Sequence, residues 1–196
     1  MINSYLLKDI LIHENIKNSS KIINLLRLIA FQIGGQVSIQ ELGRQLSMSK
    51  NTVEKYLDLL SKVFILHKIE GFSRNLRKEI TKTAKWYFYD NGIRNAVIAN
   101  FNHLGMRNDT GILWENYMIS ERIKYLGNNK IFSNNYFWRT YDKQEIDWIE
   151  EREGQLTGYE LKWNTKTVKP PSSWQSAYPD AEFEVIHPEN YMQWLS

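Results

Sequence analysis

The sequence contains no cysteine, and this absence excludes disulfide bonds, thiolate zinc sites and cysteine nucleophiles. No stretch reaches the roughly 18 apolar residues that cross a bilayer, and residues 1–14 lack the apolar core and cleavage site of a secretory signal. We therefore expect a cytoplasmic protein with no membrane partner. The histidines are scattered without metal-ligand spacing, at His13, His67, His103 and His187.

The phosphate-binding motif G-x-x-x-x-G-K-[ST] is also absent, so we expect no ATPase activity from these 196 residues alone. A hydrophobic fraction of 42% and an aromatic fraction of 13% are typical of folded globular proteins. Residues 1–100 hold 15 Lys and Arg against 8 Asp and Glu, whereas residues 101–196 hold 10 against 14. This difference favours a phosphate backbone as partner of the first half and a cation as partner of the second.

The first half has the pattern of a helix-turn-helix. Apolar residues at helical spacing predict a first helix over residues 20–33, which Gly34 and Gly35 end. Ser38 and Glu41 form a capping-box pattern at the start of a second, short helix. Ser49 can cap a third helix, whose apolar stripe is Val53, Tyr56, Leu57, Leu60 and Phe64.

A predicted β-hairpin follows, which would form the wing of a winged helix. Its strands are the aromatic and branched runs Phe64–Ile69 and Lys85–Tyr89, and a basic segment at residues 74–78 joins them. We expect a turn at residues 90–92, a helix over 93–100 and a polar linker over 102–110, where we place a domain boundary.

The second half has the pattern of a small α/β domain with a mixed sheet. We expect a helix over residues 111–125 that ends at Gly127 and Asn128, and short helices over 172–178 and 189–195. Expected strands cover residues 136–141, 145–151, 159–163 and 182–187.

Two of these strands carry the residues that could perform chemistry. Because side chains alternate along a strand, Glu145 and Asp147 should share one face, and Ile146 and Trp148 the other. In the same way Glu160 and Lys162 should point together, away from Tyr159, Leu161 and Trp163. If the strands are neighbours, Asp147 and Glu160 would hold Mg²⁺ or Mn²⁺, and Lys162 would position or activate a water for phosphodiester hydrolysis. The alternative is a cross-strand ion pair worth about 0.2–1 kcal/mol.

This order of residues, an Asp, a gap of about a dozen residues and then Glu-x-Lys, resembles the PD-(D/E)xK nuclease superfamily, whose fold is restriction-endonuclease-like. The resemblance implies that a helix before the first strand often adds an acid. Glu115, in Leu113-Trp114-Glu115-Asn116-Tyr117, occupies that position.

Nearly the whole chain resembles one family, the uncharacterised domain found C-terminal to an AAA-type ATPase in bacteria and archaea. The segments that carry the resemblance are residues 38–60, 86–94, 114–117, 138–140, 145–148 and 159–163. Residues 5–10 are similar to the segment where that ATPase half ends, so residues 1–18 would be a residual linker. The resemblance implies an ATPase partner that binds ATP and normally stands in the same chain.

The exposed face of the predicted third helix is the candidate DNA-reading surface, with Asn51 and Lys55 on the face and Ser49, Lys50 and Thr52 near the N-terminus. Candidate contacts to the DNA backbone are Arg74, Arg77, Lys78 and Lys82. Asp58 lies at i,i+3 and i,i+4 spacing between Lys55 and Lys62, so the face could equally be a self-neutralised solvated surface.

Two hypotheses follow for a chain divided into residues 1–18, a winged helix-turn-helix at 19–105 and a nuclease-like domain at 106–196. In the first, the winged helix holds DNA and the site at Asp147, Glu160 and Lys162, with Glu115, cuts it with Mg²⁺. In the second, neither part is catalytic, and the chain is a docking or regulatory module for DNA or protein.

Overall fold

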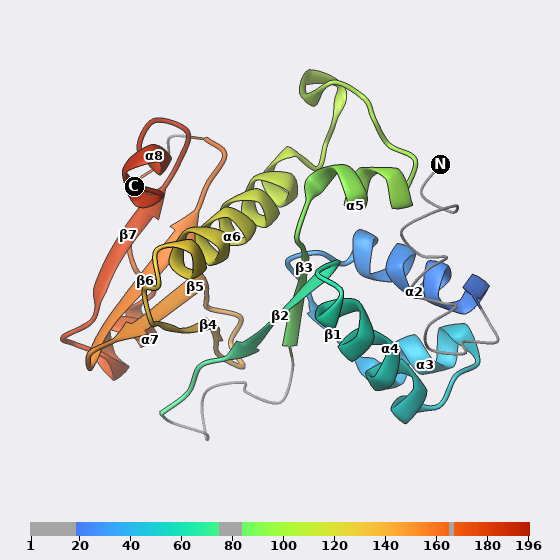
Figure 1. The fold of residues 1–196 in the computed structure, drawn as a ribbon. Helices are drawn as coiled ribbons and strands as arrows, with labels where there is room; N and C mark the ends of the chain where they lie inside the picture. Colours follow the sequence, from blue (N-terminus) through green and yellow to red (C-terminus); the bar gives the residue numbers. More distant parts are fainter. Residues whose placement is uncertain (1–18, 75–83, 165–166) are drawn as a thin grey trace.

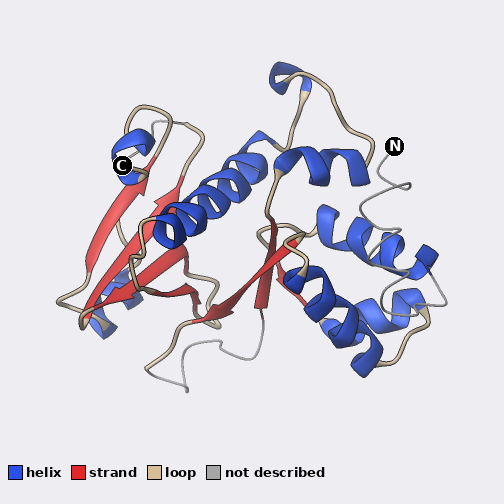
Figure 2. Cartoon of the chain, viewed as in Figure 1, coloured by secondary structure: helices blue, strands red, loops and turns tan. Residues whose placement is uncertain are grey.

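The computed structural model describes residues 19–74, 84–164 and 167–196 (Figure 1). Within these ranges the chain forms seven α-helices and one seven-stranded mixed sheet, which is an α+β architecture (Figure 2). No helix in the described part of the chain combines the length and the apolar character needed to cross a membrane.

Three helices form one end of the molecule, and two of them start at serine caps. They are α2 (Ser19–Phe31), α3 (Ile39–Leu46) and α4 (Lys50–Lys62). The Oγ atom of Ser38 accepts a hydrogen bond from the Glu41 amide at 3.3 Å, and that of Ser49 accepts one from the Thr52 amide at 3.1 Å. Both predicted caps are therefore confirmed.

The predicted hairpin is present as β2 (Leu66–Gly71) and β3 (Ala84–Phe88), which pair antiparallel, and the short β1 (Gln36–Val37) adds to the outer edge of β3. The turn expected at residues 90–92 is wrong. Asp90 instead caps α5 (Asn91–Val97), because its Oδ1 atom accepts the Ile93 amide at 2.9 Å. The expected linker contains one turn of 3₁₀ helix, Leu104–Met106.

The elements expected in the second half are all present, with shifted ends. They are α6 (Thr110–Asn128), β4 (Asn134–Arg139), β5 (Glu145–Arg152), β6 (Gln155–Leu161), α7 (Ser172–Ala177), β7 (Glu182–Ile186) and α8 (Tyr191–Trp194). Gly127 does not stop α6 but lies in its last turn. β6 begins four residues before the expected strand and ends two residues earlier, so Lys162 lies just beyond it.

All seven strands belong to one sheet, in the order β1-β3-β2-β4-β5-β6-β7. The joint between the two predicted halves is the parallel pair β2 and β4, in which Glu70 lies opposite Tyr136 and Gly71 opposite Phe137. The sheet therefore continues past the boundary that we place at residues 105 and 106, and elements of both halves can contribute to one site.

The second half of the sheet is covered on both faces. The long helix α6 crosses one face (Figure 1), and Met118 of this helix shares a buried core with Trp148, Tyr159 and Leu161. On the other face Trp174 of α7 packs with a second buried cluster that includes Trp138, Ile146, Ile149 and Tyr178. The polar residues of the candidate site lie where β5 and β6 meet the first turns of α6.

Candidate functional site

The strand that carries Asp147 is irregular at this residue. β4 pairs with β5 through Tyr136 opposite Ile149 and Trp138 opposite Ile146, so β5 has two residues where β4 has one. As a result Ile146 packs in the α7-side cluster, whereas Trp148 packs in the α6-side core. The expectation that these two residues share a face is therefore wrong. A β-bulge breaks the alternation and redirects side chains, as bulges beside active sites commonly do.

Asp147 is nearly buried and is held by the neighbouring strand. Its Oδ2 atom accepts a hydrogen bond from the Leu161 amide at 3.0 Å, just past the end of the β5–β6 ladder, where Trp148 lies opposite Tyr159. The Nζ atom of Lys162 lies 3.9 Å from the same oxygen. The side chain of Asp147 thus bridges the end of β6 and the lysine that follows it.

Glu160 and Lys162 form a direct ion pair beside Asp147. Burial raises the pKa of Glu160 from 4.5 to about 7, and the negative charge of Asp147 acts in the same direction, while Lys162 opposes both. Burial alone would lower the pKa of Lys162, but the charges of Asp147 and Glu160 outweigh it and raise that pKa. The structure therefore brings these three residues together, although Lys162 lies just beyond the end of β6.

Glu115 reaches the same site from α6. The hydroxyl of Tyr87 donates to its Oε1 atom at 2.7 Å, and the Nζ atom of Lys85 lies 3.7 Å from that oxygen. Gly34, in the turn after α2, leaves space for the carboxylate, since a Cβ atom there would lie 2.9 Å from Oε1. Burial raises the pKa of Glu115, and the charge of Asp147 adds to this effect, whereas Lys85 opposes it.

Lys85 and Tyr87 are functional candidates that the sequence reasoning missed. The side chain of Lys85 is 1% exposed, forms an ion pair with Glu145 and lies 5.3 Å from the centre of the Phe137 ring. Burial acts to lower the pKa of Lys85, but the charges of Glu115, Asp147 and Glu145 raise it above its usual value. The sequence does hold a signal for them: Lys85 and Tyr87 are two residues apart in an otherwise apolar strand, so their polar groups point to the same face.

A pocket of about 440 Å³ opens beside these groups, between the first turns of α6 and the ends of β5 and β6. Glu115, Asp147 and Lys162 line it together with Thr110, Gly111, Ile112, Leu161, Trp163 and Asn164. Charged oxygens and an amine therefore share a cavity whose other walls are largely apolar.

The donor set of this site fits a hard cation that keeps several of its own waters. Among the residues that the structure describes, no three His, Asp or Glu side chains form a group that could hold a metal ion. Mg²⁺, however, is usually held by one or two carboxylates and completes its shell with water and substrate phosphates. Asp147 and Glu160, both beside Lys162, are a pair of this kind.

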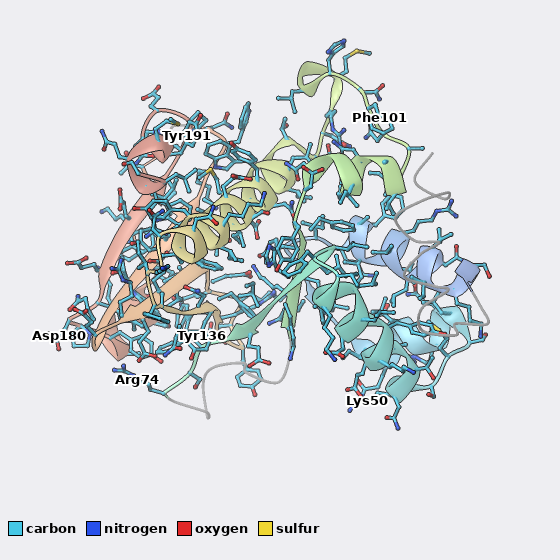
Figure 3. All side chains as sticks on the ribbon, viewed as in Figure 1. Lys50, Arg74, Phe101, Tyr136, Asp180 and Tyr191 are labelled. Carbon is cyan, nitrogen blue, oxygen red and sulfur yellow. The ribbon has the colours of Figure 1, made fainter. Side chains whose placement is uncertain are left out.

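The candidate DNA-reading residues at the start of α4 lie at the other end of the molecule, as the position of Lys50 in Figure 3 shows. Asn51 and Lys55 are exposed on α4, and the hydroxyls of Ser49 and Thr52 lie 2.8 Å apart. Lys50 pairs with Glu54 at 3.4 Å, and Lys62 pairs with Asp58 at 2.8 Å, so part of this face is self-neutralised.

The residues expected to contact a DNA backbone are only partly described. Arg74 forms an ion pair with Glu151 at 2.8 Å, and its backbone amide donates to the Tyr178 hydroxyl at 3.2 Å. Its guanidinium is therefore already engaged by the second half of the sheet. Arg77, Lys78 and Lys82 lie outside the described residues.

Two family models match the chain, one on each side of the short loop before α6. Residues 1–108 match a domain of unknown function (DUF8612), and residues 110–191 match another domain of unknown function (DUF4143). The acids at the pocket come from the second region, whereas Lys85 and Tyr87 come from the first.

Similar curated proteins are uncharacterised. A protein of Mycobacterium bovis and one of Mycobacterium tuberculosis are each 26% identical to this chain over 166 residues, which is 82% of the chain and 36% of the relative. A protein of Haemophilus influenzae is 25% identical over 104 residues, or 50% of the chain and 26% of the relative. The chain thus spans about a third of the length of the mycobacterial relatives. No solved structure matches it.

Proposed function

This chain belongs to the family described as a domain of unknown function (DUF8612), and we propose that it is a DNA-binding module of an AAA-type ATPase with a Mg²⁺-dependent phosphodiesterase site. The observation that carries the proposal is the position of the Lys162 amine, which contacts the carboxylates of both Asp147 and Glu160. Glu115, Asp147 and Lys162 also line one pocket, which is large enough for part of a substrate.

Each of these side chains has a chemical task in the proposal. Asp147 and Glu160 hold the cation, and Mg²⁺ or Mn²⁺ bound there supplies a Lewis acid for a phosphate oxygen and an attacking water. Lys162 holds that water by a hydrogen bond and offsets the charge that builds on the phosphate. Glu115, fixed by Tyr87 and Lys85, lies where it can accept a hydrogen bond from a second water or from the substrate.

The arrangement of the elements supports a finer description of the fold. Three helices followed by the β2–β3 hairpin, with β1 on its edge, are the components of a winged helix-turn-helix. A helix, α6, followed by the antiparallel strands β4, β5 and β6 with acids and lysine at one end, is the arrangement expected of a PD-(D/E)xK domain. We propose these two folds for the two parts of the sheet.

The length of the relatives supports an ATPase partner. Only 36% of each mycobacterial relative aligns with this chain, which leaves room for a further domain in those proteins. We propose that an AAA-type ATPase domain is that partner and that ATP acts through it, because the present sequence has no phosphate-binding loop of the G-x-x-x-x-G-K-[ST] type.

Nicking of supercoiled plasmid DNA with Mg²⁺ or Mn²⁺ tests the catalytic proposal. Asp147→Asn keeps an oxygen that can accept the Leu161 amide but removes the charge, and Lys162→Ala removes the amine. Each should lower the nicking rate by a factor on the order of 100 or more. The matched control is Asp180→Asn, an exposed aspartate beyond α7, which should nick like the parent. Equal nicking by all four proteins would show that a contaminant makes the cuts.

The second candidate function is a docking or regulatory module without catalysis, and the internal pairing of the charges favours it. Lys162 is already paired with Glu160, and Lys85 with Glu145, so the same groups could serve only to stabilise the fold. This alternative predicts binding without nicking. An affinity that falls steeply with salt would identify DNA as the partner, and one that ignores salt would indicate a protein.

A further inference from the structure

The pocket beside Asp147 has an apolar wall that the proposed chemistry does not use. Trp163 and Ile112 line it and remain 39% exposed each, although they are large apolar side chains. The ring of Trp163 packs edge-on against Trp114, with ring centroids 5.6 Å apart and planes at 65°. Trp114 is buried and also packs edge-on against Tyr191, so Trp163 rests on an anchored aromatic cluster.

The neighbours of the two apolar wall residues in the chain provide groups that suit a phosphate. Lys162 provides a cation, and Thr110 and Gly111 place the first turn of α6 in the wall. The carboxylate of Asp109, the residue before this helix, is bound by Arg94 and Arg107 and makes no capping bond to the first turn. A Cβ atom on Gly111 would meet nothing within 4 Å, so the backbone here is open to a ligand.

We propose that this pocket holds one unpaired nucleotide of a DNA strand, with its base against Trp163 and its phosphate at Lys162. The pocket volume of about 440 Å³ lies in the range of about 300–1,000 Å³ that is typical of small-ligand sites. In a duplex the faces of a base are covered by its neighbours, so only a base that has left the stack can contact an aromatic wall. This inference deepens the proposed function and rests on it: the substrate class becomes single-stranded or locally unpaired DNA.

Binding without cleavage tests the inference. A fluorescently labelled oligothymidine and a labelled blunt-ended duplex of the same length are titrated with the full chain in EDTA, and anisotropy is recorded. Trp163→Ala should weaken oligothymidine binding on the order of tenfold and change duplex binding by less than about twofold, because only the single strand can stack on the ring. Trp163→Phe keeps a ring and should recover most of the lost affinity.

Phe132→Ala is the matched control, since Phe132 is 93% exposed and lies between α6 and β4, outside the pocket. It should bind both probes like the parent. Ile112→Ala tests the same wall without disturbing the Trp114 cluster and should weaken oligothymidine binding in the same sense. Thermal unfolding of each variant identifies any loss that is due to misfolding.

The outcomes separate this inference from the proposed chemistry. No binding of oligothymidine by the parent, or an equal loss for both probes in Trp163→Ala, overturns the unpaired-nucleotide site even if duplex DNA is nicked. A Trp163-dependent preference for the single strand in a protein that never nicks DNA supports the nucleotide site and removes the catalytic proposal instead.

Discussion

The charges on α4 and the charges around the pocket are held in opposite ways. On α4, Lys50 with Glu54 and Asp58 with Lys62 are solvent-exposed pairs at i,i+4 spacing, each worth about 0.3–0.5 kcal/mol. Around the pocket the side chain of Lys85 is 1% exposed, and those of Asp147 and Glu160 are 12% and 14% exposed. The first set can change at little cost, whereas removal of Lys85 from the second would leave partly buried carboxylates without a counter-charge.

This difference indicates where a function constrains the molecule. A buried ion pair is often no more stabilising than apolar residues of the same size, because removing charges from water costs several kcal/mol per ion. The pocket and the groups beside it nevertheless concentrate two lysines and four carboxylates in a partly buried space: Lys85, Lys162, Glu115, Glu145, Asp147 and Glu160. An arrangement of this kind is typical of sites that use charge, whereas a pattern of exposed i,i+4 pairs is common on any helix surface.

The largest expected effect is on stability when the buried cation is removed. Lys85→Met keeps the length of the side chain but leaves Glu115 and Glu145 without their shared partner. We expect the free energy of unfolding at pH 7 to fall by about 3–5 kcal/mol, measured by urea denaturation. The same change at the exposed end, Lys50→Met, should cost no more than about 0.5 kcal/mol. Similar losses for both variants would remove the contrast between the two regions.

A second prediction concerns pH and Glu160. In the folded protein this carboxyl keeps its proton up to about pH 7, whereas in the unfolded chain it loses the proton near its ordinary pKa of 4.5. Its contribution to stability therefore declines as the pH rises between these values. Glu160→Gln should match the parent at pH 5 and be more stable than the parent by about 2–3 kcal/mol at pH 8.

The difference in unfolding free energy between the parent and Glu160→Gln reports the titration of Glu160 alone. Burial lowers the pKa of His67 to about 3, which gives the opposite slope over part of the same range, but His67 is present in both proteins. Urea unfolding at several pH values in EDTA provides the measurement, and Glu153→Gln, at the exposed β5–β6 turn, is the control. A difference between Glu160→Gln and the parent that stays constant with pH would contradict the prediction.

Local chemistry made much of the fold predictable from the sequence. Ser38 and Ser49 mark helix starts because a hydroxyl satisfies a free amide within three residues, and this requires no tertiary information. The proximity of Glu160 and Lys162 follows from the two-residue period of a strand. The contact of Lys162 with Asp147 needed only the further assumption that β5 and β6 are neighbours.

The rest of the site depends on long-range geometry that no local pattern encodes. The bulge at Asp147 comes from the register between β4 and β5, and it separates Ile146 from Trp148. Lys85 reaches Glu115 only because β2 pairs with β4 and so brings the first half of the sheet against α6. The contact spans residues 30 positions apart, in regions that the sequence suggested were separate.

At the helical end of the molecule, we expect the stability of α4 to depend more on the hydrogen bond at its N-terminal cap than on its exposed ion pairs. Ser49→Ala removes the acceptor of the Thr52 amide and should lower the free energy of unfolding by about 1 kcal/mol. Glu54→Gln removes the exposed pair with Lys50 and should cost about 0.5 kcal/mol or less. Urea denaturation of both variants is the measurement, and the reverse order would show that the surface charges of α4 stabilise it more than its cap does.

The smallest expected effect concerns DNA binding by α4, because the acids of its exposed ion pairs would weaken the attraction of this helix to phosphate. If Asn51 and Lys55 face a phosphate backbone, Asp58 repels it and also engages Lys62. Asp58→Asn should then raise the affinity for duplex DNA about two- to threefold at low salt, and the gain should disappear as salt is added. Anisotropy titrations across a salt series measure both effects, with Glu153→Gln as the control for net charge. An equal gain in the control would mean that α4 is a solvated surface and that DNA binds elsewhere, because only a local contact distinguishes one exposed acid from another.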